Sequence, residues 1–129
     1  MKNHEPENWA KTKLFLPPND YVIYKLTGEI AIDYSSAGNI GGIFDMNTRT
    51  WSEELLDAMG IPSSMMPQRI VESTDIVGGI KKEMAEELGL WEGLPVIASG
   101  IDCGAANIGL GVFDAGVYAA AIGTSMCAA

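Results

Sequence analysis

One acidic residue, Asp102, follows an apolar run and is flanked by the small residues Gly100 and Gly104. A carboxylate in such a place can orient the hydroxyl group of a small polar substrate and accept its proton. Further along the chain, a second apolar run ends in the turn-like segment Gly123-Thr124-Ser125. Consecutive backbone N–H groups and two hydroxyl groups can surround the oxygens of a phosphate. Together the two segments indicate phosphoryl transfer to an alcohol.

Each of these segments also has a simpler structural interpretation. Asp102 precedes a predicted helix, so its side chain can act as an N-cap, with or without a chemical role. Gly123-Thr124-Ser125 can equally form an ordinary hairpin turn. Two other acids, Asp33 and Asp45, are predicted to be turn or capping residues rather than catalytic ones.

The sequence predicts no metal-binding set. His4 is the single histidine and lies among polar residues, so we expect it to be solvated. Cys103 and Cys127 are the two cysteines of the chain and show no metal-ligand pattern. We expect both to be reduced and buried rather than joined in a disulfide.

The elements that must position these residues alternate between helices and strands. Helices are predicted over residues 7–16, 18–26, 80–88 and 103–110, and another begins at the capping box Thr50-Trp51-Ser52-Glu53 and ends at Gly60. Strands are predicted over residues 29–34, 75–77, 94–99 and 117–122, the last two being apolar runs typical of buried strands. The alternation indicates an α/β or α+β fold.

Two of the predicted helices have an apolar face at helical spacing. The residues expected to face the core are Trp51, Leu55 and Met59 in the first of these helices, and Ile80, Met84 and Leu88 in the second.

The charge of the chain excludes several classes of partner. The formal net charge is -9, with 8 Lys and Arg residues, so neither a nucleic acid nor an acidic membrane surface is an expected partner. No apolar stretch approaches the roughly 18 residues that a membrane helix needs, and the first residues are polar, unlike a signal peptide. We therefore expect a cytoplasmic protein.

Taken in order, short blocks along nearly the whole chain resemble the FGGY family of carbohydrate kinases. The family belongs to the ribonuclease H-like superfamily that also contains actin and Hsp70, so the resemblance implies that fold. The block around Asp102 is most similar to those of xylulose kinases. The matching blocks are Asn19-Asp20-Tyr21, Leu26-Thr27-Gly28, Asp33-Tyr34-Ser35-Ser36-Ala37, Ile43-Phe44-Asp45, Trp51, Met66-Pro67, Gly78-Gly79, Gly89-Leu90, Leu94-Pro95-Val96, Gly100-Ile101-Asp102, Ala105-Ala106 and Gly123-Thr124-Ser125.

The resemblance implies a role for each candidate residue. Asp102 would bind the acceptor hydroxyl of a sugar or polyol and act as its general base, and Gly123, Thr124 and Ser125 would contact the phosphates of ATP, which the family uses with Mg²⁺. Cys103 stands where the family often has an Asn or Gln that contacts the sugar. A thiol is a weak hydrogen-bonding group, so this departure leaves the identity of the sugar open. The resemblance also allows a homodimer.

The same resemblance predicts that the chain is an internal piece of a kinase. Residues 1–115 would be the C-terminal part of the family's N-terminal domain, and residues 116–129 the start of its C-terminal domain. The family's Asp-x-Gly-Thr-Thr phosphate loop, with its magnesium-associated aspartate, would lie upstream and the adenosine pocket downstream. We therefore expect this chain alone to be inactive. The alternative is a non-catalytic binding or interaction module on the same fold.

Overall fold

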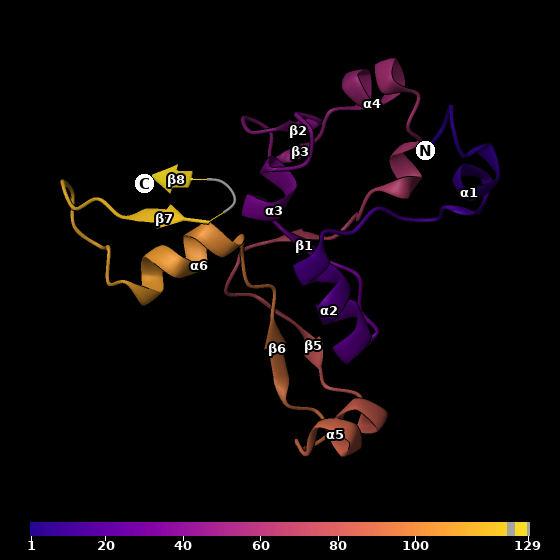
Figure 1. Cartoon of the computed structure of the whole chain (residues 1–129). Helices are drawn as coiled ribbons and strands as arrows, with labels where there is room; N and C mark the ends of the chain where they lie inside the picture. Colours follow the sequence, from indigo (N-terminus) through magenta and orange to yellow (C-terminus); the bar gives the residue numbers. More distant parts are fainter. Residues whose placement is uncertain (124–125, 129) are drawn as a thin grey trace.

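Short helices and strands alternate along the chain in the computed structural model, which describes residues 1–123 and 126–128 apart from the side chain of Cys127 (Figure 1). This alternation confirms the mixed α/β expectation. The helices are α1 (Pro6–Lys11), α2 (Pro18–Thr27), α3 (Tyr34–Gly38), α4 (Glu53–Met59), the 3-10 turn η1 (Ser63–Met65), α5 (Lys82–Leu88) and α6 (Asp102–Gly109). The strands are β1 (Ile32–Asp33), β2 (Phe44–Asp45), β3 (Thr50–Trp51), β4 (Ile70–Val71), β5 (Ile76–Gly79), β6 (Pro95–Ile97), β7 (Ala120–Ile122) and β8 (Met126–Ala128).

The described strands pair two by two. β1 and β4 are parallel, whereas β2 with β3, β5 with β6, and β7 with β8 are antiparallel. In Figure 1, β1, α2 and α3 lie at the centre, and β5, α5 and β6 extend away from it in one direction. α6, β7 and β8 extend in another direction. The start of α6 remains close to α3, because the backbone N–H of Ile101 bonds to the hydroxyl of Ser35.

One hydrophobic cluster lies where α2 packs on β5. Its buried members are Ile23, Ala31, Val77 and Ala98. From the apolar run over residues 94–99, Ala98 is buried in this cluster and Val96 packs against it half-buried, whereas Ile97 on the opposite face of β6 is exposed. The expectation that this strand is buried on both faces is therefore wrong for the residues that the structure describes.

A second hydrophobic cluster holds α4 to the connecting segments. Ile43, Leu56 and Met66 are its buried members, and the ring of Trp51 packs against them. The predicted apolar face of this helix is wrong, because Leu55 and Met59 are exposed.

The predicted apolar face is wrong because the helix begins later than the capping box predicts. Thr50 and Trp51 form β3 and pair with β2, so Ser52 becomes the N-cap and accepts a hydrogen bond from Leu55 N at 3.3 Å. Gly60 ends the helix as predicted, in the left-handed conformation with φ 63°.

Other elements also begin or end at residues that differ from the predicted ones, because their backbone or side chains bond to other segments. α1 ends at Lys11 rather than Leu16, since the following segment is extended and Phe15 N bonds to Met65 O at 2.8 Å. The strand expected over residues 29–34 shortens to β1, because Asp33 caps α3. The helix expected from Ile80 begins at Lys82, and it buries Ala85 while Leu88 is exposed. Ile80 is buried, as expected, but it precedes the helix.

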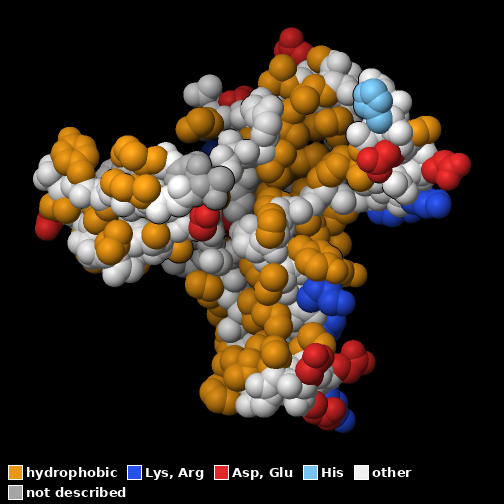
Figure 2. Space-filling model, viewed as in Figure 1, with side chains coloured by type: hydrophobic (Ala, Val, Ile, Leu, Met, Phe, Trp, Pro, Cys, Tyr) orange, Lys and Arg blue, Asp and Glu red, His pale blue; other side chains and the backbone are white. Residues whose placement is uncertain are grey.

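The C-terminal strands form an exposed hairpin. The run over residues 117–122 was expected to be buried, but β7 begins at Ala120, and Tyr118 and Ile122 are 84% and 80% exposed. Figure 2 shows hydrophobic side chains at the surface of this arm, and Phe113 and Ile108 are among the exposed ones. The described part of the chain provides no layer that covers them.

Candidate active site

Asp102 is the first residue of α6 and its side chain is exposed. Its Oδ1 accepts a hydrogen bond from the adjacent Cys103 N at 2.8 Å. The N-cap position belongs to Ile101, and no side chain caps the helix. The interpretation of Asp102 as an ordinary N-cap is therefore wrong, and the second carboxylate oxygen is left without a partner among the described residues.

Asp102 lines a cavity of about 570 Å³, within the size range of roughly 300–1,000 Å³ that small-molecule sites occupy. Asp102 is the one ionisable residue among the described residues that line it. The other polar side chains are neutral: Asn19, Ser36 and Asn39. Phe15, Leu16, Pro17, Pro18, Ile40, Gly100 and Ile101 complete the lining.

The neutral polar side chains of this cavity were not recognised from the sequence. Asn19 lies at the start of α2 and Ser36 lies in α3, and Asn19 Nδ2 donates to Ser36 Oγ at 3.0 Å. Asn39 follows α3 directly. Asn19 and Ser36 belong to blocks that resemble the family, which was the only sequence signal for them, whereas Asn39 lies outside those blocks.

A second cavity of about 460 Å³ lies beside the first. Tyr34, Ser35, Arg49 and Ile101 are among its lining residues, and Asn39 and Ile101 line both cavities. The guanidinium of Arg49 lies 4.7 Å from the centre of the Tyr34 ring and donates to Glu72 Oε1 at 2.9 Å. Because that cation is already paired, this second cavity offers no free positive charge for a phosphate.

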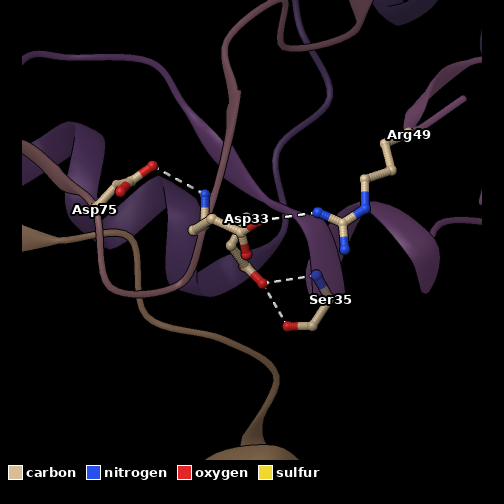
Figure 3. A network of polar contacts seen from close by, with 5 residues as sticks. Asp33, Ser35, Arg49 and Asp75 are labelled. Atoms are coloured by element: carbon tan, nitrogen blue, oxygen red, sulfur yellow. Dashed lines mark hydrogen bonds and ion pairs between the residues drawn. The ribbon is translucent and has the colours of Figure 1, made fainter.

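Asp33 anchors the residues between the two cavities (Figure 3). Its carboxylate is fully buried, and its Oδ1 accepts from Ser35 N at 2.9 Å, from Ser36 N at 3.1 Å and from the Ser35 hydroxyl. This confirms that Asp33 caps a helix. Asp45 is likewise a turn residue, and the hydrogen bond from Asn47 N lowers the pKa of its carboxyl.

Asp20 is the one acid of this region whose pKa is strongly displaced. Its side chain is 2% exposed, and neither carboxylate oxygen has a hydrogen-bond partner among the described residues. Burial raises the pKa of Asp20 to about 7, and the negative charge of Asp33 adds to this effect. A protonated Asp20 is therefore the favoured form in the folded chain below neutral pH.

The raised pKa predicts that Asp20 makes the fold less stable as the pH increases. Below pH 3.8 the Asp20 carboxyl is protonated in both the folded and the unfolded chain, so its ionisation does not affect stability. Between pH 3.8 and about 7 the carboxyl ionises only in the unfolded chain, so the free energy of unfolding falls as the pH rises. Asp20→Asn removes this dependence, so its stability relative to the natural chain should improve by roughly 2–4 kcal/mol between pH 4 and pH 8. Urea unfolding at both pH values measures the change.

The same substitution at the exposed Asp57 is the control for removing a carboxylate from the surface. Parallel pH dependences of the natural chain and Asp20→Asn would contradict the raised pKa.

The remaining predicted site residues lie away from the cavity or outside the described residues. Cys103 is a half-buried free thiol in α6, next to Asp102 but not among the residues that line the cavity. Gly123 is exposed and directly follows β7. Thr124 and Ser125 lie outside the described residues. The turn and phosphate interpretations of residues 123–125 therefore both remain predictions.

Neither a metal centre nor a membrane span is found in the described part of the chain. Residues 1–123 and 126–128 contain no group of three or more His, Cys, Asp or Glu side chains placed to hold a metal ion. No described helix has the length and apolar character to cross a bilayer.

Comparison with known proteins agrees with the family resemblance seen in the sequence. Residues 1–109 match the profile of the N-terminal domain of the FGGY family of carbohydrate kinases. The xylulose kinase of Lactococcus lactis is 36% identical over 126 residues, which are 97% of this chain and 25% of that relative. The xylulose kinase of Bacillus subtilis is 37% identical over the same share of each chain. This chain thus spans about a quarter of the length of the curated relatives it matches.

The solved structures agree with the sequence relatives. The ligand-bound xylulose kinase from Lactobacillus acidophilus superposes with a TM-score of 0.85 at 29% identity, over 98% of this chain and 26% of that one. Glycerol kinase from Plasmodium falciparum, at 24% identity, has a TM-score of 0.79 over 97% of this chain and 25% of that one, and shows the shared fold. These structures support the ribonuclease H-like fold predicted from the sequence. The chain belongs to the FGGY family of carbohydrate kinases.

Proposed function

We propose that this chain forms the acceptor side of the active site of an ATP-dependent carbohydrate kinase, in which Asp102 is the general base. The observation that supports this most strongly is a single exposed carboxylate at the wall of a cavity whose other described polar groups are neutral. A neutral hydroxyl is a weak nucleophile, and a carboxylate within hydrogen-bond distance can orient it and take its proton during transfer.

The cavity suits a sugar or polyol acceptor. Amide and hydroxyl groups donate and accept hydrogen bonds without bringing a charge, and Asn19, Asn39 and Ser36 supply such groups beside Asp102. The apolar lining, which includes Phe15 and Ile40, can pack against the carbon face of the acceptor and exclude water from the transferring group.

ATP supplies the γ-phosphoryl group, and the family uses it with Mg²⁺. The segment Gly123-Thr124-Ser125 remains our candidate for the phosphate contacts. No group of three or more His, Cys, Asp or Glu side chains gathers among the described residues, and we assign no metal ligand to this chain. Cys103 as a sugar contact, the division of domains at residue 115, a cytoplasmic location and a homodimer remain predictions.

An assay of the complete polypeptide that carries this chain tests the proposal. We expect ATP-dependent phosphorylation, followed as ADP release, with at least one member of a panel of pentuloses, gluconate and glycerol. Xylulose, gluconate and glycerol appear in the names of relatives and structural neighbours. Binding of a sugar without any ADP release would favour the non-catalytic module instead.

The purified 129-residue chain is expected to show no turnover in the same assay, because it spans about a quarter of the length of the kinases it matches. The comparison requires equal molar amounts of the chain and the complete polypeptide. Detectable ADP release that depends on both the chain and a sugar would contradict this expectation.

A further inference from the structure

We propose that Ser35 is a positioning residue for Asp102: its hydroxyl holds Ile101, the N-cap residue of α6, and thereby sets where the Asp102 carboxylate enters the cavity. This inference rests on the proposed role of Asp102 as the general base. Ser35 lies in α3, 66 residues before Ile101 in the sequence, so the contact joins two distant segments of the chain.

The hydroxyl of Ser35 makes two hydrogen bonds with different directions. It accepts from Ile101 N at 3.1 Å and donates to Asp33 Oδ1. A serine hydroxyl has one donor and two acceptor sites, so both bonds can exist together. The first bond also satisfies one of the backbone N–H groups at the start of α6, which lack partners within the helix.

Asp33 in turn gives Ser35 a fixed orientation. Asp33 is fully buried in β1, which pairs with β4, and its Oδ1 also accepts from the backbone N–H groups of Ser35 and Ser36. Figure 3 shows the Asp33 carboxylate turned toward Ser35. A buried carboxylate with three donors on one oxygen cannot easily rotate, so the O–H of Ser35 stays directed at Asp33 and a lone pair of its oxygen faces Ile101 N.

No other described hydrogen bond ties the start of α6 to another element. Among the residues that the structure describes, the bond from Ile101 N to Ser35 is the only one that links residues 100–109 to another element. The position of Asp102, the next residue, therefore depends on Ser35 more than on any other single polar contact.

The glycine before Ile101 provides a second, independent observation. A Cβ atom at Gly100 would lie 3.1 Å from Ser35 Oγ and 3.8 Å from Asp33 Oδ1. The absence of a side chain at Gly100 thus lets this segment approach Ser35 closely enough for the bond to form. An alanine at this position would push against the Ser35 hydroxyl.

The test is steady-state kinetics of the complete kinase. Ser35→Ala should lower kcat by about 10- to 100-fold while the KM for ATP stays within about twofold, because a small displacement of a catalytic group affects the chemical step. Ser35→Thr, which keeps a hydroxyl, should restore most of kcat. Gly100→Ala should reproduce the loss in a protein that still contains Ser35.

Ser73→Ala is the matched control. Ser73 Oγ lies 3.4 Å from the same Cβ position at Gly100, but its side chain makes no hydrogen bond with any other described residue. The variant should keep the natural kcat. Thermal unfolding of every variant separates a kinetic loss from a loss of folded protein, and if Ser35→Ala does not fold, Gly100→Ala and Ser35→Thr decide the question.

The outcomes separate this inference from the proposed function. If Asp102→Asn abolishes turnover but Ser35→Ala and Gly100→Ala keep full kcat, Ser35 has no positioning role and the general base stands. If Asp102→Asn retains turnover within tenfold, the proposed function is wrong. An equal loss in Ser35→Ala and Ser73→Ala would also refute the positioning role, because only one of the two hydroxyls contacts Ile101.

Discussion

Replacement of Asp102 by asparagine is expected to lower the kcat of the complete kinase by about 10²–10⁴-fold, the usual contribution of a general base. Asparagine has nearly the same shape, and its Oδ1 can still accept from Cys103 N, so the start of α6 should be retained. What disappears is the ability to accept the proton of the acceptor hydroxyl. Stopped assays of sugar phosphate formation over a range of sugar concentrations measure the effect.

The expected loss belongs to catalysis and not to folding or ATP binding. Thermal unfolding and the Kd for ATP should therefore match those of the natural protein. Asp57→Asn in α4 is the matched control, since Asp57 is exposed and does not line the cavity, and it should leave kcat unchanged. A turnover number of Asp102→Asn within tenfold of the natural one would show that another group accepts the proton.

The largest effect on stability is expected for Leu56→Ala. The Leu56 side chain is 1% exposed and packs with Ile43 and Met66 in the second hydrophobic cluster. Its truncation removes buried apolar surface and leaves a cavity, which typically lowers the free energy of unfolding by about 2–5 kcal/mol. Since α4 has no other buried side chain, we expect it to detach before the rest of the fold opens.

Leu55→Ala is the control, because it is the same substitution at the adjacent position. Leu55 is 45% exposed, so its truncation should cost less than about 1 kcal/mol. Urea unfolding of both variants and the natural protein gives the two free energies. Similar losses at both positions would contradict the burial of Leu56 and the exposure of Leu55 in α4.

Local features of the sequence predicted the element types well. α2 ends at Gly28, α4 at Gly60 and α5 at Gly89, and each glycine adopts a positive φ, as the sequence indicated. The capping role of Asp33 was also predicted correctly: its short side chain caps α3 through bonds to residues two and three positions ahead. These predictions succeeded because each depends on atoms only a few residues apart.

By itself the sequence also determined the family, through ordered blocks along nearly the whole chain, and the class of chemistry proposed for Asp102 came from the same blocks. The tertiary structure alone decided which leucine of α4 is buried, because the pairing of β3 with β2 shifted the helix start. It alone brought Asn19 and Asn39 to the cavity wall and Ser35 to Ile101. Burial and hydrogen bonds between distant segments depend on how elements pack, and no local periodicity or cap carries that information.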